Sequence, residues 1–439
     1  MKKFETISDP YKHIVLGLLV GLSAGISALI FENAVDFSTN FFLTRLVGLV
    51  LKSVYNGGEW FFKEVRWYLI PVLLFAGGLL VGFIVKYFAR EVGGHGTDVV
   101  IAAYHSGQKI PIKVPLLKIV TSAITLGSGG SAGKEGPMTQ IAGSIASFLA
   151  EKMGFSERDR RIALAAGIGA GVGAIFKVPI GGAILSAEIL YTQDLETDVL
   201  YTSLVASATG FVIFGFFKGF NPIFTVPAVE FNVLLLPFFV LEGLLCGFLG
   251  IIFIKLFFKV DAFFKNLKIP LEIKPAIGGL LVGIIALLFP HVLGSGYSRI
   301  QNILLGIYEK GTLGLPLILL LMLLPFLKMF ATVLTLGSGG SGGVFAPGMV
   351  IGGFIGAFYG YVLKTLMPHI VTSEVPFIIV GMTSFFGATG KISLSIIPMV
   401  IEMTGSLHIV PYAMISNVIA TLVTGNNTIY PSQKRRREE

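Results

Sequence analysis

Apolar stretches long enough to cross a lipid bilayer recur along the whole of this 439-residue chain. Hydrophobic residues make up 54% of the sequence and charged residues only 13%, and the mean hydropathy is +0.83. A bilayer-spanning helix needs about 20 mostly apolar residues, and such stretches include Ile14–Phe31, Leu69–Phe88, Leu200–Phe217, Leu234–Phe257 and Leu315–Val333. A soluble core of this apolarity would leave most of these faces uncovered, so the sequence predicts an all-α polytopic membrane protein.

A glycine-rich motif occurs twice, 210 residues apart. The stretch Thr125-Leu-Gly-Ser-Gly-Gly-Ser-Ala-Gly-Lys-Glu-Gly-Pro137 returns as Thr335-Leu-Gly-Ser-Gly-Gly-Ser-Gly-Gly-Val-Phe-Ala-Pro347, and nine of the thirteen positions are identical. Glycine-broken segments at matching positions of two halves are the best sequence indication of a membrane transport site. The copies differ where the first carries the carboxylate of Glu135 and the second carries the apolar pair Val344-Phe345.

Each copy is expected to lead from a loop into the start of a helix. Glycine lets backbone N–H groups approach a ligand closely, and Pro137 and Pro347 suit the first turn of a helix. A helix N-terminus carries unpaired N–H groups and a partial positive charge, which together bind anions. Because intramembrane carboxylates usually have a function, we interpret Glu135 as a group that occupies the anion site until it is protonated. The alternative is a carboxylate that caps its own helix or pairs with Lys134.

Three other interpretations of the motif fit less well. A nucleotide-binding P-loop needs a glycine five residues before Gly133 and a Ser or Thr directly after Lys134. This chain has Ser128 and Glu135 at those two positions. An intramembrane serine protease could use Ser341 with His408 as its base, but the first copy carries an alanine within the matching motif, and a protease gives no reason for the duplication. Close packing of small residues explains the Gly/Ala run at 165–174 but not the long ordered match.

The chain divides into two halves. Two prolines and weak periodicity at Gly219–Glu230 indicate a connecting loop, and Gly94-His-Gly-Thr97 in the first half is echoed by Gly294-Ser-Gly-Tyr297 in the second. Basic residues beside membrane-spanning segments stay cytoplasmic, so Lys2-Lys3 and Lys434–Arg437 predict that both termini are cytoplasmic. If each half crosses the membrane an odd number of times, the two halves must then be inverted relative to each other. The basic tails could also be merely solubilising or bind lipid headgroups. The expected segments are a cytoplasmic tail (1–12), a first membrane repeat (13–218), a connecting loop (219–231), a second membrane repeat (232–430) and a basic cytoplasmic tail (431–439).

These motifs resemble the CLC family of chloride channels and chloride/proton antiporters, and the resemblance covers roughly Ile14 to Tyr430. The family's G-[RK]-E-G-P motif is present at Gly133–Pro137, its G-x-F-x-P motif at Gly343–Pro347, and Glu402-Met-Thr-Gly405 matches a further family helix. The resemblance implies two inverted repeats of broken, tilted helices. It also implies a homodimer with a separate pore in each subunit.

The resemblance further implies roles for single residues. Glu135 matches the gating glutamate, and the backbone N–H groups of Val344 and Phe345 match those that line the central chloride site. Tyr430 falls at the position of a pore tyrosine whose hydroxyl donates to chloride, although a residue of the interfacial aromatic belt is the other interpretation. The outer part of the anion site corresponds to Lys134, Glu135, Gly136, Phe345 and Ala346.

Two departures from the family pattern bear on function. The family's first motif usually reads G-S-G-I-P, with the serine touching the central anion, whereas this chain has Gly94-His95-Gly96-Thr97-Asp98. The His95 imidazole either donates to the anion or turns away and leaves the contact to backbone N–H groups.

The second departure is at Ile189, where proton-coupled members often carry a second glutamate. The apolar residue favours a channel, although some exchangers also lack that acid. We expect Glu188 and Glu402 to be structural carboxylates bound by helix ends or polar partners.

The sequence therefore predicts a CLC-type protein that moves chloride across the cell membrane through a pore gated by Glu135. The prediction leans to passive conduction, with coupled chloride/proton exchange as the alternative and an intramembrane serine protease as a remote one. The expected anion-binding residues are Gly94, His95, Gly96, Lys134, Glu135, Gly136, Val344, Phe345, Ala346 and Tyr430. The lone Cys246 permits no disulfide within the chain and no Cys/His metal site. No enzymatic activity, metal or organic cofactor is expected, and the expected partners are a second copy of the chain, membrane lipids, chloride and possible protons, but no nucleic acid.

Overall fold

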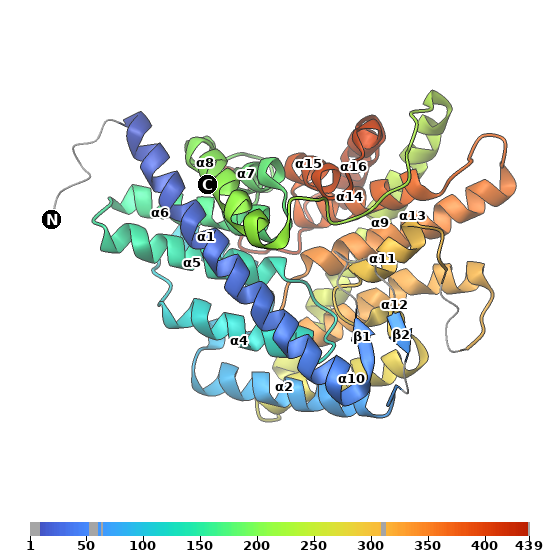
Figure 1. Cartoon of the computed structure of the whole chain (residues 1–439), viewed down its shortest axis with the longest axis horizontal. Helices are drawn as coiled ribbons and strands as arrows, with labels where there is room; N and C mark the ends of the chain where they lie inside the picture. Colours follow the sequence, from blue (N-terminus) through green and yellow to red (C-terminus); the bar gives the residue numbers. More distant parts are fainter. Residues whose placement is uncertain (1–8, 52–59, 63–64, 309–312, 438–439) are drawn as a thin grey trace.

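The computed structural model describes residues 9–51, 60–62, 65–308 and 313–437, so most of the predicted N-terminal tail lies outside the described residues. Within these ranges, sixteen α-helices form two successive sets of eight (Figure 1). The first set consists of α1 (Asp9–Thr39), α2 (Leu69–Tyr87), α3 (Thr97–Ser106), α4 (Lys113–Gly127), α5 (Glu135–Lys152), α6 (Glu157–Ile175), α7 (Pro179–Glu188) and α8 (Thr197–Lys218). The second set consists of α9 (Leu236–Asn266), α10 (Ile273–Leu288), α11 (Tyr297–Leu304), α12 (Leu317–Gly337), α13 (Phe345–Leu366), α14 (Val375–Gly390), α15 (Ser393–Thr404) and α16 (Val410–Thr424).

Short elements join these helices. They are a π-helical turn η1 (Asn40–Val47), a two-stranded antiparallel sheet of β1 (Leu49–Leu51) and β2 (Trp60–Phe62), and the 3-10 turns η3 (Arg90–Val92), η4 (Val233–Leu235), η5 (Pro290–Val292) and η6 (Leu407–Ile409). A stretch without regular structure, 219–232, separates α8 from η4.

The helices differ widely in length. Seven helical segments of the described chain are long and apolar enough to cross a membrane. In contrast, α3, α7 and α11 have only 10, 10 and 8 residues, and at about 1.5 Å per residue such helices end inside a bilayer. The helical chain with several candidate spans and short, broken helices confirms the all-α membrane architecture that the sequence predicted.

The same unusual backbone feature marks both repeats. Lys177, between α6 and α7, and Lys391, between α14 and α15, have φ values of 59° and 55°, which are uncommon for residues with a Cβ. The Lys177 ammonium donates to the carbonyl of Lys218 at the end of α8 (3.1 Å). The Lys391 ammonium donates to the Thr424 hydroxyl at the end of α16 (2.7 Å). Each lysine therefore caps the last helix of its own repeat, where a cation is stabilised by the helix dipole.

Close helix contacts in each repeat depend on glycine. α1 packs on α8, and α9 packs on α16. A Cβ on Gly21 of α1 would lie 2.5 Å from the Ala206 carbonyl, and a Cβ on Gly243 of α9 would lie 2.5 Å from the Ser416 carbonyl. Small residues of this kind let membrane helices approach backbone to backbone.

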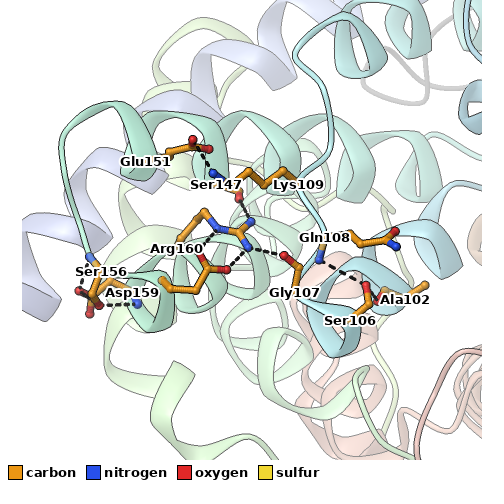
Figure 2. A network of polar contacts seen from close by, with 11 residues as sticks. Ala102, Ser106, Gly107, Gln108, Lys109, Ser147, Glu151, Ser156, Asp159 and Arg160 are labelled. Carbon is orange, nitrogen blue, oxygen red and sulfur yellow. Dashed lines mark hydrogen bonds and ion pairs between the residues drawn. The ribbon is translucent and has the colours of Figure 1, made fainter.

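A buried arginine fixes the far end of α3. The Arg160 side chain is 2% exposed, and its guanidinium donates to the Ser147 hydroxyl of α5 (3.1 Å) and to the Gly107 carbonyl that follows α3 (2.7 Å) (Figure 2). It also binds Glu157 on its own helix. Because α3, α5 and α6 are joined at this point, the loop that precedes α3 is held in a defined place against the start of α5.

Candidate anion site

The two glycine-rich motifs pair with each other through their backbones. The Gly133 N–H donates to the Gly343 carbonyl (2.8 Å), and the Gly343 N–H donates to the Gly133 carbonyl (2.7 Å). α5 begins two residues after Gly133 and α13 begins two residues after Gly343. In neither helix does the side chain of the preceding residue accept a hydrogen bond from a first-turn N–H group. The first-turn N–H groups of two helices from opposite repeats are thus brought to one place, where their partial positive charges add.

A third segment joins this pair. The Gly94 N–H donates to the Gly340 carbonyl (3.0 Å), and the Gly342 N–H donates to the Gly94 carbonyl (3.2 Å). Gly96, with φ +80°, precedes α3. The His95 carbonyl is so near the start of α5 that a Cβ on Gly136 would lie 2.1 Å from it. The predicted site residues Gly94, His95, Gly96 and Gly136 therefore lie together.

The Glu135 carboxylate lies buried at the meeting point of α5 and α13. Its side chain is 1% exposed, and Oε1 accepts a hydrogen bond from the Tyr297 hydroxyl (2.8 Å). A Cβ on Gly133 would lie 2.1 Å from Glu135 Oε2 and 3.1 Å from the Ala346 nitrogen. The negative charge of Glu135 is therefore next to the first-turn amides of α13, which is the position that an anion would take.

Lys134 does not pair with its neighbour in sequence. Its ammonium forms an ion pair with Glu32 of α1 (2.7 Å), a residue that is 3% exposed. The structure therefore does not show the alternative interpretation, in which Lys134 pairs directly with Glu135. Lys134 can serve the site only through its backbone and its longer-range charge.

Aromatic rings enclose the apolar side of the site. Val344, Phe345 and Ala346 are each at most 3% exposed. The Phe345 ring lies 4.5 Å from that of Phe386 and 6.4 Å from that of Phe176, measured between ring centroids. These buried apolar side chains lower the local polarity, so electrostatic interactions with the backbone N–H groups are strengthened.

Tyr430 and His95 lie side by side. Their ring centroids are 5.5 Å apart, Tyr430 is 1% exposed, and Thr97 lies beside the Tyr430 hydroxyl. A tyrosine buried in this way is not part of an interfacial belt. The His95 Nδ1 atom is buried and has no hydrogen-bond partner among the described residues, so the imidazole has a polar atom to offer a ligand.

Three residues at the site were not identified from the sequence. Tyr297, which binds Glu135, belongs to the Gly294–Tyr297 echo, which indicated only a repeat. The buried Lys118 donates to the carbonyls of Val92 (3.1 Å) and Gly94 (2.9 Å), and Lys328 donates to the corresponding carbonyls of Val292 (2.9 Å) and Gly294 (2.6 Å). The two lysines are 210 residues apart, as are the glycine motifs. This shared spacing is the sequence feature that could have identified the lysines as equivalent residues of the two repeats.

Glu188 and Glu402 bind helix ends. The Glu188 oxygens accept from the Leu394 N–H (2.7 Å), the Ser395 N–H (2.7 Å) and the Ser395 hydroxyl (2.6 Å) at the start of α15. The Glu402 oxygens accept from the Ile180 N–H (3.0 Å) and the Gly181 N–H (2.9 Å) at the start of α7. Each of these two helices thus caps the other.

Ile189, which is 2% exposed, follows Glu188 at the end of α7. The described residues contain no group of three or more His, Cys, Asp or Glu side chains placed to hold a metal ion.

Comparisons with known proteins agree with this architecture. The family model described as voltage gated chloride channel matches residues 77–425. An H(+)/Cl(-) exchange transporter, ClcA, of Vibrio cholerae is 29% identical over 96% of this chain and 88% of its own. A voltage-gated ClC-type chloride channel, ClcB, of Escherichia coli is 28% identical over 94% of this chain and 96% of its own. The solved structure of a slow cyanobacterial Cl-/H+ antiporter superposes with a TM-score of 0.82 at 22% identity, covering 97% of each chain. This multi-pass membrane protein therefore belongs to the CLC family of voltage-gated chloride channels and chloride transporters.

Proposed function

We propose that the chain exchanges chloride for protons across the cell membrane, with Glu135 as the gate that both ions use. The observation that carries this proposal is the position of the Glu135 carboxylate, beside the uncapped first-turn amides of α13. A carboxylate and a chloride ion compete for such a place because both carry one negative charge. The named exchange transporter among the relatives supports exchange more strongly than the passive conduction to which the sequence leaned.

The contacts suggest how the gate operates. While ionised, Glu135 accepts from Tyr297 and fills the anion position. Protonation removes its charge and weakens its hold on the positive helix ends, so chloride can replace it. The amides of Val344, Phe345 and Ala346, the segments Gly94–Gly96 and Lys134–Gly136, and the Tyr430 hydroxyl would then hold the ion. Several weak contacts of this kind let an ion enter and leave.

Passive chloride conduction is the second candidate. Ile189 offers no proton acceptor at the end of α7, and one of the relatives carries the name of a channel. For either mechanism we propose a homodimer in the cell membrane with both termini cytoplasmic, no metal or organic cofactor and no enzymatic reaction.

Flux measurements on sealed vesicles that contain the purified protein test this proposal. An outward chloride gradient should drive protons into the vesicles against their own gradient, at a fixed chloride-to-proton ratio. Glu135→Gln, which mimics the protonated gate, should keep chloride flux but lose both proton movement and the dependence of flux on acid. Chloride flux without proton movement in the unmodified protein would identify a channel. Loss of all flux in a folded Glu135→Gln variant would contradict the gating role.

A further inference from the structure

The segment that carries Tyr430 folds back over the protein. We call residues 428–437 the C-terminal strap. They contain no helix, so tertiary contacts hold them in place. The last described residue, Arg437, contacts Glu196 and Asp194 in the segment between α7 and α8. The predicted basic tail is therefore packed against the protein as far as Arg437.

One anchor of the strap lies two residues after Tyr430. The Ser432 N–H donates to Asp98 Oδ1 (2.8 Å), and the Ser432 hydroxyl donates to Asp98 Oδ2 (2.7 Å). Asp98 is the second residue of α3, which follows the Gly94–Gly96 loop. The next residue, Gln433, donates to the carbonyls of Ile189 (3.0 Å) and Gly390 (3.1 Å). The strap is thus tied to the helix whose N-terminal loop borders the anion site.

The second anchor is Arg437. Its guanidinium pairs with Glu196 (2.9 Å) and donates to the Thr197 hydroxyl (3.0 Å), while its backbone N–H donates to Asp194 (3.1 Å). Between the anchors, the strap runs beside the loop after α7, with the Thr192 N–H donating to the Lys434 carbonyl (2.9 Å).

Glu196 connects this anchor to α3 as well. It is 5% exposed, and its Oε2 accepts from the hydroxyls of Tyr104 in α3 (2.9 Å) and Tyr191 (2.9 Å). Without Arg437 this carboxylate would lose a direct ionic partner in a buried position, which is unfavourable. Both anchors therefore join the strap to α3. These contacts fix the position of Tyr430 relative to His95, which precedes α3.

We propose that Asp98 and Arg437 are positioning residues that keep the strap in register with α3 and thereby aim the Tyr430 hydroxyl into the anion site. This inference rests on the proposed function of Tyr430 as a donor to chloride. It adds that the affinity for chloride is set in part by an ion pair formed seven residues further along the strap.

Chloride titration calorimetry on the full-length protein tests the inference. Tyr430→Phe, which removes the donor alone, should raise the Kd for chloride by about tenfold. Ser432→Ala and Arg437→Ala should each raise it by about three- to tenfold. Arg437→Lys, which keeps a cation for Glu196, should remain near the unmodified protein. Arg436→Ala is the matched control, because it removes the same charge from the neighbouring residue, which acts on Asp194 through its charge but forms no ion pair with Glu196 among the described residues.

A double-mutant cycle separates positioning from a general loss of structure. In the Tyr430→Phe background, Arg437→Ala should weaken chloride binding no further, since the hydroxyl that it positions is gone. An additional loss in that background would overturn the inference, and so would equal affinities for Arg437→Ala and Arg436→Ala. If Arg437→Ala does not fold, Ser432→Ala in the same cycle decides the question. Unchanged affinity in Tyr430→Phe would instead remove Tyr430 from the proposed anion site, while leaving the gating role of Glu135 intact.

Discussion

Tyr297 contacts the Glu135 carboxylate directly. A single substitution at Tyr297 can therefore isolate the contribution of this contact to gating. Its hydroxyl donates to Oε1 at 2.8 Å, and a hydrogen bond to a charged group contributes about 1.5–3 kcal/mol. Tyr297→Phe removes that bond, so the ionised form of Glu135 loses stability relative to the protonated form. We expect the pH of half-maximal chloride transport to rise by about one unit.

Vesicle flux measured between about pH 4 and 9 checks this shift. Tyr359→Phe is the matched control, because its hydroxyl donates to the Phe238 carbonyl (3.1 Å) and not to a gate residue. An unshifted profile in Tyr297→Phe, or an equal shift in both variants, would show that the bond to Glu135 does not tune the gate.

Glu242 is a buried carboxyl for which the proposed transport cycle has no role. It is 0% exposed, and neither oxygen has a hydrogen-bond partner among the described residues. The next residue, Gly243, packs on α16 as Gly17 packs on α8, so the equivalent of Glu242 in the first repeat is Leu16, which is 1% exposed. The position thus accepts leucine in one repeat.

We expect Glu242→Leu to stabilise the protein by about 1–4 kcal/mol, because it replaces an unpaired buried polar group with an apolar side chain. The midpoint of heat-induced loss of the folded peak in size-exclusion chromatography should rise while chloride flux stays unchanged. The reverse change, Leu16→Glu, should lower that midpoint. A lower midpoint for Glu242→Leu, or loss of flux, would mean that the carboxyl has a function.

At the scale of helices, α7 and α15 are linked by reciprocal carboxylate caps. Glu188 and Glu402 each use both oxygens on the first N–H groups of the other helix. Because these hydrogen bonds are charge-assisted, Glu188→Gln should lower the heat stability but leave the chloride-to-proton ratio unchanged. Glu402→Gln should behave in the same way. Loss of proton transport in Glu188→Gln alone would instead identify Glu188 as a proton carrier.

The sequence predicted helix starts better than it predicted contacts. Glycine and proline spacing indicated where α5 and α13 begin, and Glu135 and Phe345 are indeed their first residues, because such starts are encoded locally. The bond from Tyr297 to Glu135 spans 162 residues, and Arg437 donates to Thr197 across 240 residues. Contacts of this kind depend on how whole repeats pack, so a local pattern gives no direct sign of them. The equal spacing of Lys118 and Lys328 was visible, but only the structure connects it to the loops at Gly94 and Gly294.

At the scale of the whole molecule, the starts of α7 and α15 form one exposed apolar face. α7 and α15 have only 10 and 12 residues, and their first turns expose Ile180 (56%) and Leu394 (57%). Glu402 and Glu188 already accept hydrogen bonds from the first N–H groups of these helices, so the helix starts leave only the apolar side chains of Ile180 and Leu394 uncovered. A second copy of the chain placed on this face would bury both side chains, and we place the contact of the proposed homodimer here.

A single chain already encloses the candidate anion site, since Glu135, Val344, Phe345, Ala346 and Tyr430 are each at most 3% exposed within it, so transport should not require the dimer. We expect Ile180→Trp combined with Leu394→Trp to give monomers in light scattering, since the added volume prevents close contact across the face, while each chain keeps its chloride flux. Ile30→Trp, on an exposed part of α1 (54%), is the control and should remain dimeric. Dimers that persist in the double variant would place the interface elsewhere. Folded monomers without flux would mean that the transport site is completed by the neighbouring chain, and the single-chain site described above would then be insufficient.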